Sequence, residues 1–514
     1  MSITKLPLTV EALASEPVLV AAWKKAEAYI RQHNSYADVL ELDRTNSDLE
    51  RVVQNISAEI LSNRELQPNA LRLVLSPKSQ EWKVSKSSVW GPAGRVKAAG
   101  RLRPLAHATT RDQIISMAFL ILFADTIETS LGDPCQTAEN RSAFQTVSYG
   151  NRLMCNPVGP NLRFRWGSST SYRKYFQDYQ TFLSRPNAVV AENFKASNNW
   201  AIIHLDLSQF YDRVRPSVLH DKVLALCGNE LEDGLRDRFR SFFNWCWTED
   251  DISAAMEYGG AAKPVIEGFN AVALPQGLVA SGFFANAVLI DFDQSVQAEI
   301  RAEYSNRRWN IIDYCRYVDD IRVVVRHEAG PERSARKRIQ NSVCKFLTGK
   351  LQKQATGLTI NLDKSEAIFG DTRPNGTRPV AAMVRRVAHN TSGVLDLFLA
   401  EETLDILDNL LPVAPDAPMK FGRGFQNTFP EVKPDIQEAT IARFSAQRFR
   451  RVFRQSRPMC EDQPKGQSLS EDGMSRQYLD QKASFYSRRL VERWIRDPSN
   501  VRLLRACDKI NVTF

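Results

Sequence analysis

The sequence predicts an α+β fold with additional α-helical regions at both ends of the chain. Between residues 199 and 369, β-prone runs at 201–207 and 314–325 are separated by helical patterns, one of them at about 332–354. From residue 371 onwards, Pro- and Gly-bearing spacers separate helical blocks, which predicts a helical C-terminal domain.

The N-terminal elements follow in order. Apolar residues recur at helical spacing through the first 90 residues, for example around Trp23 and over 48–61. A Gly-, Pro- and Arg-bearing segment at 90–104 predicts a loop and hairpin. The apolar segment 113–131 is long and periodic enough to form a buried helix, and Gly132 marks its end.

Composition excludes several classes of protein. The 514 residues carry 68 Lys and Arg against 59 Asp and Glu, a net charge of +9, and 43% are hydrophobic, so disordered, collagen-like and rod-like chains are excluded. The longest apolar run, 117–123, is far shorter than the ~20 residues of a membrane span, and the N-terminus does not resemble a signal peptide. We therefore expect a cytosolic protein without a membrane partner. Eight cysteines without a CxxC pair predict reduced thiols rather than a zinc site.

Two adjacent carboxylates mark the most informative segment. Asp319 and Asp320 separate two β-prone runs within 314–325, so we expect them at the tip of a β-hairpin. Two like charges side by side are unfavourable unless a cation lies beside them. The alternative is a solvated Asp-Asp turn, which is common in proteins generally.

A third carboxylate favours the cation site. Asp206 ends an apolar run and is followed by Phe210 and Tyr211. If its strand neighbours the hairpin, Asp206 and Asp319 converge, and oxygen ligands without His or Cys suit Mg²⁺. Two such ions about 4 Å apart can activate a 3′-hydroxyl and stabilise the leaving pyrophosphate of a phosphoryl transfer.

Together these motifs resemble the ordered blocks of reverse transcriptases. The blocks are RLRPL at 101–105, LDLSQFYD at 205–212, LPQGLVAS at 274–281, YVDD at 317–320 and GLTINLDK at 357–364. The resemblance covers about residues 90 to 370 and implies a right-hand polymerase with reverse-transcriptase fingers and palm. The expected division is an N-terminal helical region at 1–90, fingers at 91–199, palm at 200–370, and an α-helical thumb or C-terminal domain at 371–514.

The resemblance implies a role for each matched residue. Asp206, Asp319 and Asp320 correspond to the catalytic carboxylates, which hold two Mg²⁺ ions, with Mn²⁺ able to substitute; Asp206 and Asp319 would bridge the ions and Asp320 would orient. Tyr211 corresponds to the ring beneath the incoming sugar, which collides with a 2′-hydroxyl and so selects deoxynucleotides. For Phe210 we prefer simple packing in the palm core.

The resemblance also implies contacts to the deoxynucleoside triphosphate. Guanidinium groups clamp phosphate oxygens, and a glycine before a small-residue helix lets backbone approach a ligand. Without the resemblance, the arginines and lysine among these residues are surface cations, and Gly277 serves an ordinary helix start. The expected contacts are Arg101, Arg103, Tyr211, Gln276, Gly277 and Lys364.

Shorter segments resemble one branch of reverse transcriptases. No RNase H or HNH-type endonuclease is evident after residue 370. Segments 148–153, 208–211 and 494–505 resemble the bacterial abortive-infection and "unknown group" enzymes, which are defence-associated. This resemblance implies antiphage defence, cDNA synthesis on a cognate non-coding RNA, and a homo-oligomer such as a trimer or hexamer in the bacterial cytoplasm. Our subtype hypothesis is the ninth defence type.

Two basic and aromatic segments are candidate nucleic-acid surfaces. Segment 443–457 has six arginines, three phenylalanines and no acid, and segment 161–174 mixes arginines with Phe164 and Trp166. A solvated basic helix docked by its phenylalanines explains the first segment equally well. The candidate residues are Arg163, Arg165, Arg450, Arg451 and Arg454.

Some relatives prime synthesis on a tyrosine hydroxyl. By position alone, Tyr478 and Tyr486 are candidate priming residues, whose hydroxyl would receive the first nucleotide. A packing role is the favoured alternative for both.

Three functions remain to be distinguished. The first is an RNA-directed DNA polymerase in phage defence, and the second is a template-independent or protein-primed DNA polymerase of abortive-infection type. The third is an RNA-binding scaffold with an inactive palm, against which the three intact acids argue. An RNA-dependent RNA polymerase is disfavoured by Tyr211 and by YVDD in place of a Gly-Asp-Asp tip.

Overall fold

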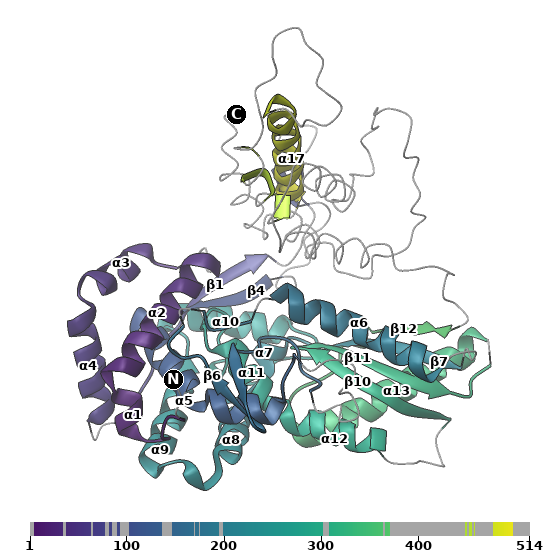
Figure 1. Ribbon diagram of the computed structural model, residues 1–514, viewed down its shortest axis with the longest axis horizontal. Helices are drawn as coiled ribbons and strands as arrows, with labels where there is room; N and C mark the ends of the chain where they lie inside the picture. Colours follow the sequence, from purple (N-terminus) through teal and green to yellow (C-terminus); the bar gives the residue numbers. More distant parts are fainter. Residues whose placement is uncertain are drawn as a thin grey trace. The chain divides into compact units, whose positions relative to one another are not determined.

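The chain forms two compact units in the computed structural model (Figure 1). One comprises Met1–Leu75 with Arg103–Arg373, and the other comprises Ser76–Leu102 with Pro374–Phe514. The structure describes residues 5–33, 37–62, 65–77, 82–84, 90–92, 102–135, 146–168, 170–173, 175–194, 199–301, 308–330, 332–362, 365–370, 448–449, 452–454, 457 and 476–496.

Four helices gather at one end of the first unit (Figure 1). They are α1 (Val10–Ala14), α2 (Glu16–His33), α3 (Val39–Ser47) and α4 (Leu49–Leu61). Side chains cap two of them: the hydroxyl of Thr9 accepts from the Ala12 amide, and the carboxylate of Asp38 accepts from two amides of α3. The helical region expected over residues 1–90 is longer than the one that the structure shows. The helices end at Leu61, and the β-prone sequence RLVLSP forms strand β1 (Arg72–Pro77).

A buried helix, α5 (Thr110–Leu131), runs through the core of this unit. It begins three residues before the predicted start because the Thr109 hydroxyl caps it by accepting from the Asp112 amide. Gly132 ends it with a φ of 75°. Among the described residues, α5 is the helix that is long and apolar enough to cross a membrane. However, 78% of its most apolar 18-residue stretch is buried inside the protein, as expected of a core helix.

An antiparallel four-stranded sheet forms the other main part of the unit. The spatial order is β10 (Trp309–Tyr317), β11 (Asp320–His327), β7 (Trp200–Asp206) and β12 (Glu366–Phe369). The predicted strand-turn-strand over 314–325 and the predicted strand at 201–207 are confirmed, and the structure shows that they are neighbours. Helix α13 (Arg333–Gln354) matches the helix predicted at about 332–354.

Alternate side chains of the sheet face different layers. Ile203, Val323 and Val325 belong to the main core, into which α12 (Ile290–Arg301) and α13 also pack. Ile202 and Val324 belong to a second cluster with residues of α6 (Tyr175–Asn193). The sheet is therefore covered on both faces, which explains the near-continuous apolar sequence of β7 and β11.

Shorter elements complete the first unit. Three two-stranded sheets are present among these elements. Strand β5 (Cys155–Val158) pairs with β6 (Asn161–Phe164), β8 (Trp245–Cys246) pairs with β9 (Ala271–Val272), and β1 pairs with β4 (Leu102–His107). The helices are α7 (Phe210–Arg213), α8 (Pro216–Cys227), the 3-10 turn η2 (Gly228–Glu230), α9 (Asp233–Phe242), α10 (Glu249–Ala261) and α11 (Ser281–Val288).

In the second unit, the described elements are the strand pair β2 (Trp82–Val84) and β3 (Trp90–Pro92), and helix α17 (Arg476–Arg496). The rings of Phe449 and Tyr486 stack 3.8 Å apart at an interplanar angle of 3°. Phe453 is buried as well, so the two described phenylalanines of this basic segment, Phe449 and Phe453, face inward as expected, while Phe444 lies outside the described residues. Most of the expected C-terminal domain, 371–447 and 497–514, lies outside the described residues.

A cluster of aromatic rings joins α5 to α9 and α11. The ring centroid of Phe239 lies 5.5 Å from Phe119, 5.3 Å from Phe123, 4.6 Å from Phe243 and 5.6 Å from Phe284. All five rings are fully buried. Edge-to-face and tilted contacts of this kind add to the free energy gained by burying the ring area.

Phe239→Ala should lower the free energy of unfolding by about 3–5 kcal/mol, because it leaves a ring-sized cavity at the centre of this cluster. Urea unfolding of the full chain, followed by tryptophan fluorescence, measures the change. Met256→Ala is the matched control, since that side chain is 52% exposed on α10 and its loss should cost less than about 0.5 kcal/mol. Equal unfolding midpoints for the two variants would contradict the assignment of the cluster to the core.

Candidate active site

The backbone brings three aspartates to one edge of the four-stranded sheet. Asp320 pairs with Asp206 in the register of β11 and β7, and it faces Tyr317 across the hairpin turn. The Leu207 amide donates to the Asp319 carbonyl oxygen at 3.1 Å. Each of the three aspartates is partly accessible to solvent. The sequence predicted this convergence on the condition that the two strands are neighbours, and the strand order meets that condition.

The backbone of the hairpin tip has an unusual conformation. Val318 has a φ of 58°, in the left-handed region that β-branched residues rarely adopt. Such strain costs of order 1–3 kcal/mol and persists only where surrounding structure enforces it. A Cβ atom at Gly150 would lie 2.5 Å from Cγ2 and 2.8 Å from the backbone nitrogen of Val318. Glycine at 150 is therefore required for the tip to adopt this conformation.

A buried ion pair lies directly beneath the tip. Arg316 is fully buried and pairs with Asp293 of α12 at 2.8 Å. Its guanidinium also donates to the Asn286 side-chain oxygen at 2.8 Å and to the Val318 carbonyl at 3.4 Å. Burial raises the pKa of Asp293, and the charge of Arg316 opposes that rise. Because a buried charge without a partner is costly, this arrangement ties the hairpin to α11 and α12.

The segment before β5 is held against the same pair. The Arg316 amide donates to Val147 O at 2.8 Å, and the Tyr149 amide donates to Arg316 O at 3.0 Å. The Asn286 side-chain amide donates to Gly150 O at 2.8 Å. Residues 147–150 are thereby fixed beside the tip.

Residues 359–361 of the block at 357–364 continue the backbone pairing beyond Asp206. The Asn361 amide donates to the Asp206 carbonyl at 2.7 Å, and the Ser208 amide donates to Thr359 O at 2.9 Å. This places the matched strand-turn segment directly beside the first carboxylate. Lys364, predicted near the pyrophosphate, lies outside the described residues.

Phe210 and Tyr211 have different surroundings. Phe210 is 2% exposed, which confirms the prediction that it packs in the core. Tyr211 is partly accessible, and its hydroxyl accepts a hydrogen bond from the Asn151 side-chain amide at 3.1 Å. Burial raises the pKa of Tyr211, and the negative charge of Asp319 adds to the rise. Tyr211 is therefore a neutral phenol that lies close enough to Asp319 for that charge to affect its pKa.

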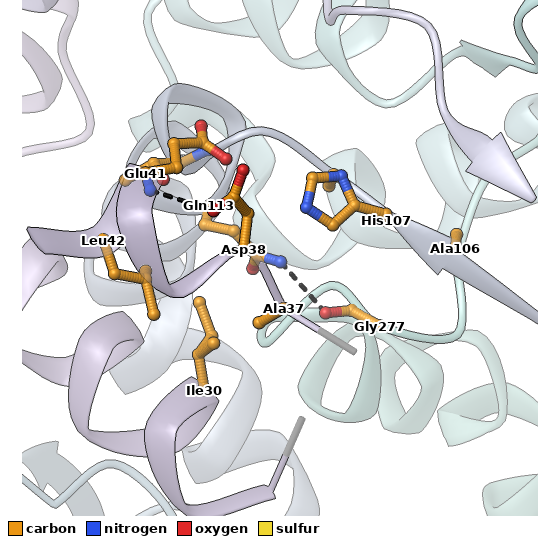
Figure 2. A pocket seen from close by; sticks show the side chains of 11 residues that line it. Ile30, Ala37, Asp38, Glu41, Leu42, Ala106, His107, Gln113 and Gly277 are labelled. Atoms are coloured by element: carbon orange, nitrogen blue, oxygen red, sulfur yellow. Dashed lines mark hydrogen bonds between the residues drawn. The ribbon is translucent and has the colours of Figure 1, made fainter. Parts of the chain in front are cut away.

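The Pro-Gln-Gly segment is held from both sides. The Gln276 side chain donates to Asp212 at 2.6 Å, and Tyr258 donates to the other oxygen of Asp212 at 2.8 Å. The Gln113 amide group donates to Gly277 O at 3.0 Å and accepts from the Val279 amide at 3.0 Å, so α5 clamps the loop (Figure 2). The sequence analysis missed Asp212 and Gln113, because each acts only through a contact distant in sequence.

A small pocket lies beside this loop (Figure 2). Its lining includes Asp38, which caps α3, with Glu41 of α3, His107 of β4, Gln113 and Gly277. The Glu41 carboxylate accepts from the Thr110 amide at 2.6 Å. The N-terminal helices therefore contribute directly to the surroundings of the Pro-Gln-Gly segment.

Of the two predicted phosphate-binding arginines, one is described. Arg103 is exposed on β4, whose Leu105 forms a bridge with Gln276, and the Ala106 amide donates to Gln276 O at 2.8 Å. Arg103 is thus on the strand that borders the Pro-Gln-Gly segment. Arg101 lies outside the described residues.

The two candidate nucleic-acid residues in and directly after β6 differ from each other. Arg163 is partly buried and pairs with Asp125 at 3.1 Å, which neutralises its charge. Arg165 is exposed and donates to the Asn156 side chain at 2.6 Å. Lys25 of α2 donates to the carbonyl oxygen of Arg165, and burial lowers the pKa of Lys25 to about 8. The two arginines therefore stay predictions as RNA contacts, and Arg165 is the better placed.

In the second unit, Arg454 is exposed, while Arg450 and Arg451 lie outside the described residues. Tyr486, predicted as a candidate primer, is fully buried against Phe449, which favours the packing alternative. The side chain of Tyr478 lies outside the described residues.

The residues present suit a divalent cation that also binds substrate phosphates. Within the described part of the chain, no three or more Asp, Glu, His or Cys side chains are grouped so that they alone could hold a metal ion, and this includes the three aspartates. Mg²⁺ does not require one, because it commonly takes one or two carboxylates and completes its shell with water and substrate phosphates. Asp206, Asp319 and Asp320 would supply oxygen donors to such an ion.

Residues 159–393 match the family model described as reverse transcriptase (RNA-dependent DNA polymerase). The chain contains a reverse transcriptase domain. The matched range includes all three carboxylates, the Pro-Gln-Gly segment and the four-stranded sheet. The fold is that of an α+β polymerase. No curated protein matches the chain.

Two solved structures similar to the chain are telomerases. One, from Candida albicans in complex with a fragment of telomeric RNA, has a TM-score of 0.33 and 12% identity, and covers 91% of this chain. The other, an apo telomerase from Candida tropicalis truncated from its C-terminal domain, has a TM-score of 0.29 and 11% identity over 60% of this chain. The chain spans 65% and 53% of the lengths of those two chains.

Gly150→Ala should reduce DNA synthesis about ten- to a hundredfold, because the added methyl group displaces Val318 and with it the carboxylates of the tip. Steady-state incorporation of labelled deoxynucleotides measures the rate. Gly260→Ala is the matched control: Gly260 is exposed in α10 with open space around it, so its replacement should leave the rate unchanged and favour the helix. If both variants retain the wild-type rate, Gly150 does not determine the tip geometry.

Proposed function

We propose that the protein is an RNA-directed DNA polymerase that acts in antiphage defence and makes cDNA on an associated non-coding RNA in the bacterial cytoplasm. The observation that carries the polymerase activity is the convergence of Asp206, Asp319 and Asp320 at one sheet edge within a reverse transcriptase domain. Three intact carboxylates at this position are not expected of an RNA-binding scaffold.

The residues around the carboxylates support nucleotidyl transfer. When bound, two Mg²⁺ ions, or Mn²⁺ in their place, would supply charge neutralisation and activation of the primer 3′-hydroxyl. Asp206 and Asp319 would hold them, and Asp320 would orient the site. The strained tip and the buried pair beneath it fix these carboxylates before substrate arrives, which is how preorganised sites stabilise developing charge.

The surrounding segments supply candidate contacts to the nucleotide. Gln276 is oriented by Asp212, and Gly277 by Gln113, so this loop is rigid where a base or sugar would pack. Arg103 on the bordering strand offers a guanidinium for the triphosphate. The ring of Tyr211 would exclude a 2′-hydroxyl and so favour deoxynucleotides over ribonucleotides.

The defence role is supported by the resemblance of segments 148–153, 208–211 and 494–505 to defence-associated enzymes. Two of these segments are neighbours of the candidate site: residues 147–150 flank the hairpin tip, and 208–211 follow Asp206 directly. The cognate RNA, the homo-oligomer and the absence of a membrane partner belong to the same proposal, as does the ninth defence type as subtype.

Asp319→Ala/Asp320→Ala should abolish DNA synthesis, since it removes two of the three cation-binding carboxylates. The protein is purified with the RNA that accompanies it, Mg²⁺ and labelled deoxynucleotides are added, and any DNA is quantified and sequenced. Glu249→Ala/Asp250→Ala is the matched control, because it removes two adjacent acids that are exposed on α10.

The sequenced product separates the candidate activities. DNA complementary to the bound RNA supports templated synthesis, and DNA without that complementarity supports a template-independent polymerase. Equal synthesis by wild type and the Asp319→Ala/Asp320→Ala variant would contradict the assignment of the site. No synthesis by wild type, even with an added primer and template, would favour the scaffold.

A further inference from the structure

Asn151 links the segment beside the hairpin tip to Tyr211. Its side-chain nitrogen donates to the Tyr211 hydroxyl oxygen at 3.1 Å. The two residues are far apart in the sequence, and neither the three carboxylates nor the Pro-Gln-Gly segment requires this contact. This hydrogen bond holds the hydroxyl of Tyr211, the residue expected to lie beneath the incoming sugar.

The backbone of Asn151 is fixed in a conformation that few residue types tolerate. Its φ is 51°, in the left-handed region, where asparagine is among the more favourable non-glycine residues. The Asn286 side chain donates to Gly150 O at 2.8 Å and to Asn151 O at 3.4 Å. On the other side, the next residue, Arg152, forms a fully buried ion pair with Glu128 of α5 at 2.8 Å. Asn151 is thus attached to a rigid part of the core.

The side chain of Asn151 is confined as well. A Cβ atom at Gly282, in the first turn of α11, would lie 2.7 Å from Nδ2 and 2.9 Å from Cγ of Asn151. The amide group therefore occupies the space that any larger residue at 282 would fill. It is packed between α11 and Tyr211, so its hydrogen bond holds the phenol from a fixed point.

We propose that Asn151 is a positioning residue that fixes the ring of Tyr211 and thereby sets the discrimination between deoxy- and ribonucleoside triphosphates. This inference rests on the proposed function, since it requires Tyr211 to lie beneath the sugar of the incoming nucleotide. A ring excludes a 2′-hydroxyl only if it cannot turn away when the hydroxyl presses against it. The Asn151 amide resists that movement, because turning the ring breaks the hydrogen bond.

The protonation state of Tyr211 agrees with this role. Burial and the charge of Asp319 raise its pKa, so the phenol stays neutral at physiological pH. A neutral phenol oxygen is an acceptor for the Asn151 N–H and keeps its own proton available for a second partner.

The test compares kcat/KM for a deoxynucleotide and the ribonucleotide of the same base, with the full chain and its bound RNA. Asn151→Gly removes the amide group and keeps the left-handed backbone, and Tyr211→Phe removes the hydroxyl and keeps the ring. One hydrogen bond contributes about 0.5–1.5 kcal/mol, so each variant should reduce the deoxy-to-ribo ratio about three- to tenfold. The double variant should lose no more than the larger single loss, because both changes remove the same interaction.

A merely structural role for Asn151 predicts a different pattern. It would lower kcat/KM for both nucleotides equally and leave their ratio unchanged, and that result would overturn the proposal, as would strictly additive losses in the double variant. If Asn151→Gly fails to fold, Tyr211→Phe carries the test alone, and a wild-type ratio in that variant is the overturning result. Asn229→Gly, exposed in η2, is the control and should keep the wild-type ratio.

The failure of the proposed function would be visible separately. A wild-type protein that makes no DNA, or that uses both nucleotides equally, removes the sugar-selecting role of Tyr211 and the positioning role with it. A wild-type protein that selects deoxynucleotides, combined with an unchanged ratio in Asn151→Gly, removes only the positioning role.

Discussion

The ion pair between Arg316 and Asp293 is the interaction on which the candidate site depends. Neither charge could remain buried alone, so β10 and α12 must be held together for the fold to form. The same guanidinium reaches Asn286 and the Val318 carbonyl, which places it directly beneath the carboxylates. Asn286 in turn binds the backbone at Gly150 and Asn151, so one buried group of polar side chains organises the hairpin tip, its flanking segment and the residue that contacts Tyr211.

Local sequence patterns were sufficient to predict the main elements of the site. Strand and hairpin signals located Asp319 and Asp320 at a turn, and helical periodicity located α5 and α13. The prediction of a helical region up to residue 90 was wrong after Leu61, because the periodic apolar pattern ends there and residues 72–77 form strand β1. The position of Asp206 beside Asp319 could be predicted only by assuming that its strand is a neighbour of the hairpin.

The residues that orient the site could not be predicted in this way. Gln113 acts on a loop 164 positions later, and Asn151 acts on Tyr211 across 60 positions. Nothing in the local sequence of either residue distinguishes it from a surface amide. The need for glycine at 150 likewise becomes visible only when Val318 is in place opposite it.

The N-terminal helices and α5 belong to the same compact unit as the carboxylates. Helix α5 supplies Gln113 to the Pro-Gln-Gly segment and Glu128 to Arg152, while α3 lines the pocket beside Gly277. Substitutions in the core of these helices should therefore affect catalysis as well as stability, because the same contacts that stabilise the unit also position the loop and the tip.

The central claim is that the register of β7 and β11 builds a divalent-cation site from Asp206, Asp319 and Asp320. Mn²⁺ uptake, followed by loss of the electron paramagnetic resonance signal of the free ion in the presence of a non-hydrolysable deoxynucleotide, tests it most directly. Wild type should bind Mn²⁺ at least about tenfold more tightly than Asp206→Asn, with Glu249→Ala/Asp250→Ala equal to wild type. Equal uptake by wild type and Asp206→Asn would contradict the claim.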